Sequence, residues 1–175
     1  MRKLSNSELK RVTLDVFRAS EKMPVVIVLD NLRSMHNVGS IFRTADAFHI
    51  EKIHLCGITA TPPHREIQKT ALGATESVEW SYFPEVSESL GLLKAEGFRI
   101  VAVEQMDESI QLGKFNPAEG EKLALIFGNE ISGISDETIT YLDLAVEIPQ
   151  FGTKHSFNVT VSAGIVLWHL FLRFP

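Results

Sequence analysis

The chain has 175 residues, of which 45% are hydrophobic and 22% charged, and a formal net charge of −5. This length predicts one domain whose core needs no disulfide or metal for stability. The single cysteine, Cys56, excludes an internal disulfide and a cysteine-based zinc site. No apolar run approaches the ~20 residues of a membrane span, and the polar N-terminus lacks a signal peptide's apolar stretch. We therefore expect a soluble, cytoplasmic protein.

Charge is distributed unevenly along the chain. Residues 1–43 hold 8 Lys/Arg against 4 Asp/Glu, whereas residues 44–175 hold 9 against 18. The basic excess is either a solvated helix face or a patch that faces a polyanion. The cations concerned are Arg2, Lys3, Lys10, Arg11, Arg18, Lys22, Arg33 and Arg43.

Strand and helix patterns alternate along the chain. Ser5 and Glu8 form a possible capping box, which predicts a helix over residues 5–21. Short runs rich in β-branched residues predict strands at 25–30, 52–57, 78–83, 99–104, 123–128 and 144–149. Apolar residues at helical spacing predict helices at 38–48, 85–96 and 156–172. This alternation predicts an α/β domain with a mainly parallel sheet and helices on both faces.

The glycines at the end of the fifth predicted strand invite comparison with phosphate loops. Residues 128–135 have the G-x-x-x-x-G spacing, but Ile134 replaces the lysine that a P-loop needs, and Glu130 would repel a triphosphate. The eleven glycines include no G-x-G pair, which argues against a Rossmann site. The segment is either an ordinary glycine turn or a backbone contact for a neutral or cationic ligand.

Two further polar stretches follow predicted strands. Asn37 can cap the next helix, and Arg43 is either a surface ion-pair partner or a fork for a phosphate or a reacting oxygen. Ser156 either caps the last helix or belongs to a site. His155 beside Ser156 raises the possibility of a serine hydrolase, but no G-x-S-x-G elbow is present.

Together, these stretches resemble the SpoU (TrmH-like) branch of the SPOUT family of RNA methyltransferases. The family's motifs N-x-G-x-x-x-R, G-x-E-x-x-G and I-P…S-x-N-V occur in order at residues 37–43, 128–133 and 148–159. The resemblance covers residues 24–172. It implies a helical extension at 1–23, a SPOUT methyltransferase domain at 24–175, and a deep trefoil knot in the C-terminal part.

The resemblance also implies an activity. The cofactor would be S-adenosylmethionine, held in the knot, and the reaction would transfer its methyl group to a ribose 2′-hydroxyl of tRNA or rRNA, with tRNA favoured. It further implies a homodimer formed through the C-terminal helix, and neither a metal nor a membrane.

Functional residues are carried over from the family's motifs. The catalytic residues are Arg43, Asn37, Glu130, Ser156 and Asn158. The cofactor-binding residues are Val103, Glu104, Gly128, Asn129, Gly133, Ile148, Ser156 and Phe157. The basic excess of residues 1–43, rather than a motif, predicts RNA binding by Arg11, Arg18 and Arg33, together with the motif residue Arg43. We expect Arg43 to clamp an RNA phosphate and orient the hydroxyl, and Glu130 to organise the motif loops by hydrogen bonds to backbone or to Asn37.

Two alternatives remain. One is a catalytically inactive RNA-binding homologue of the same fold, and the other is a knotted methyltransferase that acts on a base nitrogen. On the leading hypothesis, the basic residues of the first 43 positions should gather on one face beside the active site, doubled by dimer symmetry, so that RNA binding depends on salt.

Overall fold

The β-branched runs form the strands of one sheet. In the computed structural model, which describes residues 1–9 and 11–174, the sheet has seven strands in the order β3-β2-β1-β6-β4-β7-β5, and every ladder is parallel. The strands are β1 (Met23–Asp30), β2 (Ile50–Cys56), β3 (Glu79–Phe83), β4 (Arg99–Val103), β5 (Ile110–Gln111), β6 (Leu123–Phe127) and β7 (Leu144–Glu147). The six predicted strands and the parallel sheet are thereby confirmed, and only β5 at the edge was not expected.

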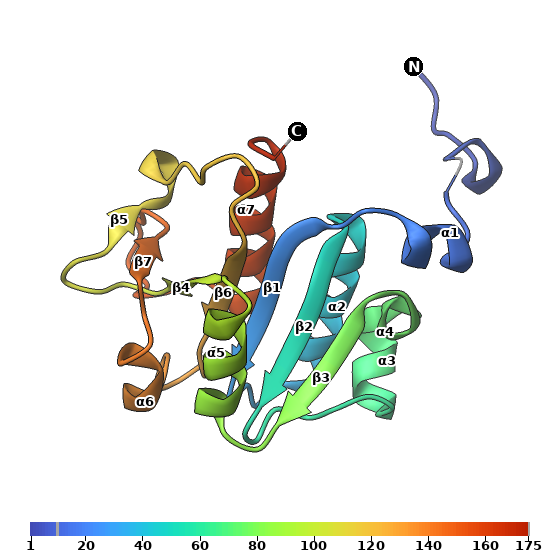
Figure 1. The fold of residues 1–175 in the computed structure, drawn as a ribbon. Coiled ribbons are helices and arrows are strands. Elements are labelled where there is room, and N and C mark those ends of the chain that lie inside the picture. The colour runs from blue at the N-terminus through green and yellow to red at the C-terminus, as the bar shows by residue number, and fades with distance from the viewer. Residues whose placement is uncertain (10, 175) are drawn as a thin grey trace.

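Helices cover both faces of the sheet, as predicted (Figure 1). One layer consists of α2 (Met35–Ala47), α3 (Arg65–Ala71), α4 (Ala74–Ser77) and α7 (Val159–Phe171). The other layer consists of α5 (Val86–Ala95) and α6 (Asp136–Ile139). Side chains of β1 point alternately to the two faces of the sheet, which shows why both helix layers are needed. Ile27 packs into the first core and Val28 into the second, and both are fully buried.

The predicted helix over residues 5–21 is wrong as one element. The described part contains a 3-10 turn, η1 (Asn6–Leu9), and a separate short helix, α1 (Leu14–Ala19). Thr13 caps α1 by accepting a hydrogen bond from the amide of Val16. β-Branched residues and side-chain capping both favour a new helix start here over continuation. The capping pair itself exists, since the Ser5 amide donates to Glu8 at 2.8 Å.

The N-terminal segment packs at the amino ends of the strands. Phe17 is buried with its ring stacked on His49 at 4.4 Å. The guanidinium of Arg18 donates to the carbonyl oxygen of Glu76 at 3.1 Å. Arg33, by contrast, follows the carboxyl end of β1. One chain therefore does not gather its N-terminal cations on a single face, and Lys10 of that set lies outside the described residues.

Two helix starts differ from those expected. Ser34, not Asn37, caps α2, so Asn37 lies inside the first turn with its side chain available for other contacts. Asn158, not Ser156, caps α7, because its side-chain oxygen accepts the amide hydrogen of Thr160 at 2.9 Å. Asn37 and Asn158 are both part of the candidate site.

The helices α3 and α4 were not predicted because they are short and separated by a sharp break. Leu72 and Gly73 adopt left-handed backbone conformations between them. A close approach then seats α3 on α2, since a Cβ on Gly39 would lie 2.2 Å from the carbonyl oxygen of Ile67. Among the described residues, no helix combines the length and apolar character that a membrane crossing requires.

A buried histidine makes stability depend on pH. His54 of β2 is 3% exposed, and its Nδ1 lies 2.7 Å from the hydroxyl of Ser89. Burial, assisted by the charge of Lys52, lowers the pKa of His54 from 6.5 to about 4. Between these pH values the unfolded chain binds one more proton than the folded chain, so the free energy of unfolding should fall as the pH drops from 6.5 to about 4.

Urea unfolding at several pH values across this range tests this dependence. The free energy of unfolding should depend less steeply on pH in His54→Asn than in the wild type. The control His155→Asn, at an exposed position, should show the same slope as the wild type.

Candidate active site

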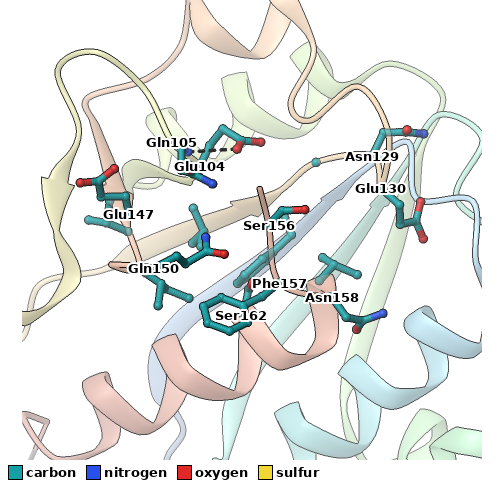
Figure 2. A pocket seen from close by; sticks show the side chains of 16 residues that line it. Glu104, Gln105, Asn129, Glu130, Glu147, Gln150, Ser156, Phe157, Asn158 and Ser162 are labelled. Carbon is teal, nitrogen blue, oxygen red and sulfur yellow. Dashed lines mark hydrogen bonds between the residues drawn. The ribbon is translucent and has the colours of Figure 1, made fainter. Parts of the chain in front are cut away.

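A cavity of about 330 Å³ opens at the carboxyl ends of β4, β6 and β7 (Figure 2). Ligands of open α/β sheets bind at this edge. The cavity is lined by seven of the eight predicted cofactor residues, namely Val103, Glu104, Gly128, Asn129, Ile148, Ser156 and Phe157. The predicted catalytic residues Glu130 and Asn158 also line it, whereas Gly133 lies just outside.

Sequence reasoning missed other lining residues, which are Gln105, Phe127, Val146, Glu147, Gln150, Val159 and Ser162. Gln105 and Glu147 stand at the carboxyl ends of β4 and β7, so the strand-end rule could have found them. Gln150 and Ser162 carry no such signal, because the loop before α7 and the helix itself bring them to the cavity.

The two glycines of the G-x-E-x-x-G motif fold the loop after β6 back on itself. Asn129 and Gly133 exchange backbone hydrogen bonds of 2.8 and 2.9 Å. A Cβ on Gly128 would lie 2.2 Å from the carbonyl carbon of Gly133 and the amide of Ile134. Gly133 has a φ of +71°, which glycine adopts at low cost. The motif therefore fixes the backbone that forms one wall of the cavity.

Glu130, at the tip of this loop, holds the start of α2. Its carboxylate accepts hydrogen bonds from the amides of Arg33 at 2.9 Å and Ser34 at 3.0 Å, and from the side-chain amide of Asn37 at 2.9 Å. Burial opposes ionisation of Glu130, but these hydrogen bonds outweigh it and lower the pKa below its usual range. The expected role of Glu130 in organising the loops thus has a geometric basis.

The third motif joins the same network. The side-chain amide of Asn158 donates to the side-chain oxygen of Asn37 at 3.3 Å. Figure 2 shows Glu130 and Asn158 on the same side of the cavity. Residues from three distant stretches of the sequence therefore meet in one series of hydrogen bonds, which we call the Glu130–Asn37–Asn158 chain.

The structure leaves two predicted catalytic residues without a partner in this network. Arg43 lies on α2, exposed and outside the cavity. Within the described part of the chain, its guanidinium has no hydrogen-bond or ion-pair partner. Ser156 lines the cavity and is exposed. Both side chains are thus available to a ligand.

The carboxylates that line the cavity favour a positively charged ligand. Glu104, Glu130 and Glu147 line the cavity, and among the described residues no lysine or arginine does. Carboxylates in a partly enclosed site attract a positive charge and repel phosphate. Gln105 Nε2 donates to the carbonyl oxygen of His155 at 2.6 Å and so holds the loop before α7 over the cavity. The site fits a cationic ligand without phosphate, such as S-adenosylmethionine, and its volume falls in the usual range for small-molecule sites.

Comparison with known proteins identifies the family. The model of the SpoU rRNA methylase family matches residues 24–168. The chain therefore belongs to this family, as its three motifs predict.

Several proteins are similar to this chain in sequence or in fold. The chain is 32% identical over 158 residues to the 23S rRNA (guanosine-2′-O-)-methyltransferase RlmB of Neisseria meningitidis serogroup B, covering 87% of this chain but only 60% of that relative. The crystal structure of the A. aeolicus TrmH/SpoU tRNA modifying enzyme matches with a TM-score of 0.79 at 25% identity, covering 91% and 79% of the two chains. An AdoMet-bound rRNA methyltransferase from Sinorhizobium meliloti matches with a TM-score of 0.78 at 25% identity, covering 89% and 58%.

Replacing the Glu130 carboxylate tests its role as an anchor. In Glu130→Gln, an NH₂ group would replace one carboxylate oxygen. This NH₂ group would face at least one N–H group that now donates to the carboxylate, so that N–H group would lose its acceptor. We expect the free energy of unfolding to fall by about 1–3 kcal/mol and the amides of Arg33 and Ser34 to exchange faster with deuterium. Glu119→Gln, at an exposed position, is the matched control and should change neither quantity. Unchanged amide exchange in Glu130→Gln would contradict the anchoring role.

Proposed function

We propose that this protein is an S-adenosylmethionine-dependent methyltransferase that modifies a ribose 2′-hydroxyl of RNA, with tRNA the first substrate to test. The observation that carries the proposal is the Glu130–Asn37–Asn158 chain at the rim of a cavity suited to a cationic cofactor. The names of the Neisseria, A. aeolicus and Sinorhizobium relatives support it. Such an enzyme would meet its substrate in the cytoplasm.

The cavity residues would hold the cofactor. S-adenosylmethionine supplies a methyl group on a positively charged sulfonium. Backbone groups of Gly128 and Ile148, together with Ser156, would contact it, and Phe157 would provide an apolar wall. Glu104 and Glu147 would favour its positive charge.

The residues outside the cavity would prepare the RNA. Asn37 and Asn158 are held by the network, so their remaining hydrogen-bonding capacity can fix the ribose. Arg43 would clamp a phosphate and orient the hydroxyl, since a guanidinium is a strong phosphate ligand but a poor base. The proton of the hydroxyl would pass to phosphate or be shared with it. Arg33 would add a second phosphate contact. Arg11 and Arg18 would contact parts of the RNA that lie away from the cavity.

We also propose the domain division and the knot that the family resemblance implies. Residues 24–175 would form the catalytic domain and residues 1–23 its extension. Hydrogen bonds tie the segment between β4 and β6 to the loop before α7 and to the last turn of α7. Gln105 Nε2 donates to the carbonyl oxygen of His155, and the carbonyl oxygen of Phe115 lies 2.7 Å from Nε2 of His169. These contacts fit a chain whose final loop and helix pass through the preceding segment as a trefoil knot.

Finally, we propose that the protein forms a homodimer through α7. Val161, Trp168 and Phe171 on this helix, and Leu172 directly after it, expose between 47% and 61% of their surface. The Trp168 and Phe171 rings stack at 5.9 Å and form one apolar surface, which a second copy could bury.

Removing the Arg43 guanidinium tests the proposed chemistry. With labelled S-adenosylmethionine and tRNA transcripts, Arg43→Ala should lower the rate of methyl transfer by about 10²–10³-fold, because a preorganised contact to the reacting group is lost. Calorimetry should show unchanged S-adenosylmethionine affinity, because Arg43 lies outside the cavity. Lys122→Ala, at the amino edge of the sheet, should keep full activity. Wild-type protein that binds RNA but transfers no methyl group would favour the inactive homologue instead.

The dimer is tested by placing a charge in the apolar surface of α7. Trp168→Glu should shift the mass in sedimentation equilibrium toward the 19.5 kDa of one chain, because burying an unpaired carboxylate is costly. Ile139→Glu, another exposed apolar site, should leave the mass unchanged. A wild-type protein that sediments as a monomer would contradict the proposed dimer.

A further inference from the structure

A cluster of charged side chains lies where α2 and α3 begin, beside the Glu130–Asn37–Asn158 chain. His36, which precedes Asn37, places its Nε2 2.8 Å from the carboxylate of Glu66 on α3. Lys69 lies 2.6 Å from the other oxygen of the same carboxylate. Arg65, the first residue of α3, is exposed next to Glu66. This cluster therefore adjoins the residues that we expect to hold the ribose.

The contact between the two helices fixes the position of this cluster. The hydroxyl of Thr70 donates to the carbonyl oxygen of His36 at 3.0 Å. Gly39 lets the two helices approach so closely that a Cβ there would clash with Thr70 and with backbone. Side chains on α3 are thus held at a set place relative to Asn37, which is what a preorganised binding surface needs.

The cluster is positive although the whole chain is negative. Residues 33–43 and 64–70 contain four arginine and lysine residues but one carboxylate, that of Glu66. The carboxylate of Glu130 also lies at the start of α2, so four cations face two carboxylates and the local balance is positive. Glu66 is already shared by His36 and Lys69. Among the described residues, Arg33, Arg43 and Arg65 have no ion-pair partner. These guanidinium groups are free to bind an anion outside the protein.

We propose that Arg65 and Lys69 bind the RNA phosphates that flank the modified nucleotide, and that with Arg33 and Arg43 they form the RNA-docking surface of this chain. We call these four residues the α2–α3 cation surface. The inference rests on the proposed function, because it assigns the substrate contacts of that same site. None of the sequence motifs includes Arg65.

The order of the strands indicates the course of the RNA. Along the carboxyl edge of the sheet, the start of α3 follows β2 and the start of α2 follows β1 (Figure 1). The cavity comes next, at the carboxyl ends of β6, β4 and β7. A strand of RNA along this edge would place one ribose at Asn37 and Asn158, with its neighbouring phosphates over the α2–α3 cation surface. The carboxylates of the cavity would repel those phosphates and leave the cavity to the cofactor.

Charge removal at Arg65 tests the surface. Fluorescence anisotropy with a labelled tRNA transcript, repeated at several salt concentrations, should show about five- to tenfold weaker binding for Arg65→Gln and a salt slope lower by about one. Arg65→Lys should retain most of the affinity. Lys94→Gln, on α5 across the opposite face of the sheet, is the matched control and should bind like the wild type. Calorimetry with S-adenosylmethionine should give the wild-type affinity for all three variants.

The outcomes separate this inference from the proposed function. If wild type methylates RNA but Arg65→Gln keeps both its RNA affinity and its salt slope, the docking surface is wrong and the activity stands. Equal losses in Arg65→Gln and Lys94→Gln would also overturn it, because the effect would then follow net charge alone. If the wild type binds S-adenosylmethionine yet neither binds nor methylates RNA, the proposed function fails, and the docking surface fails with it.

Discussion

The placement of one carboxylate governs the geometry of the site. Glu130 accepts two backbone amides at the start of α2 and the side-chain amide of Asn37, and Asn37 in turn accepts from Asn158. A negative charge at a helix start is also favoured by the helix dipole. Because Gly128 and Gly133 close the loop that carries Glu130, three motifs far apart in sequence hold one arrangement. The cavity, the proposed ribose contacts and the α2–α3 cation surface all depend on this arrangement.

The sequence was informative where the pattern was local. Buried runs such as residues 123–127 predicted strands within one or two positions, and the family resemblance predicted nine of the sixteen residues that line the cavity. It failed where long-range contacts decide the structure. Asn37 suits a helix cap, but Ser34 takes that place, and Asn37 is drawn to Glu130 instead. Helix α3 has only seven residues, so its pattern was too short to detect, and its place depends on Gly39.

The separation of charges on one small domain would allow an acidic chain to bind RNA, as we propose. The basic excess of the first 43 residues suggested one patch, yet Arg18 and Arg33 lie at opposite ends of β1 in a single chain. The cations that adjoin the site come from α2 and α3 instead, and part of that set lies beyond the basic segment. Net charge therefore describes solubility and long-range attraction, whereas the local balance decides which edge of the sheet can hold a phosphate.

The proposed reaction transfers the methyl group to a ribose oxygen of RNA. Its most direct test is mass spectrometry of nucleosides from tRNA and rRNA that has been incubated with the purified protein and S-adenosylmethionine carrying a deuterated methyl group. We expect the label to stay with the ribose fragment when the glycosidic bond breaks, and to occur at a defined position in the RNA. Label on the base fragment, or no label in RNA from a protein that binds the cofactor, would contradict it.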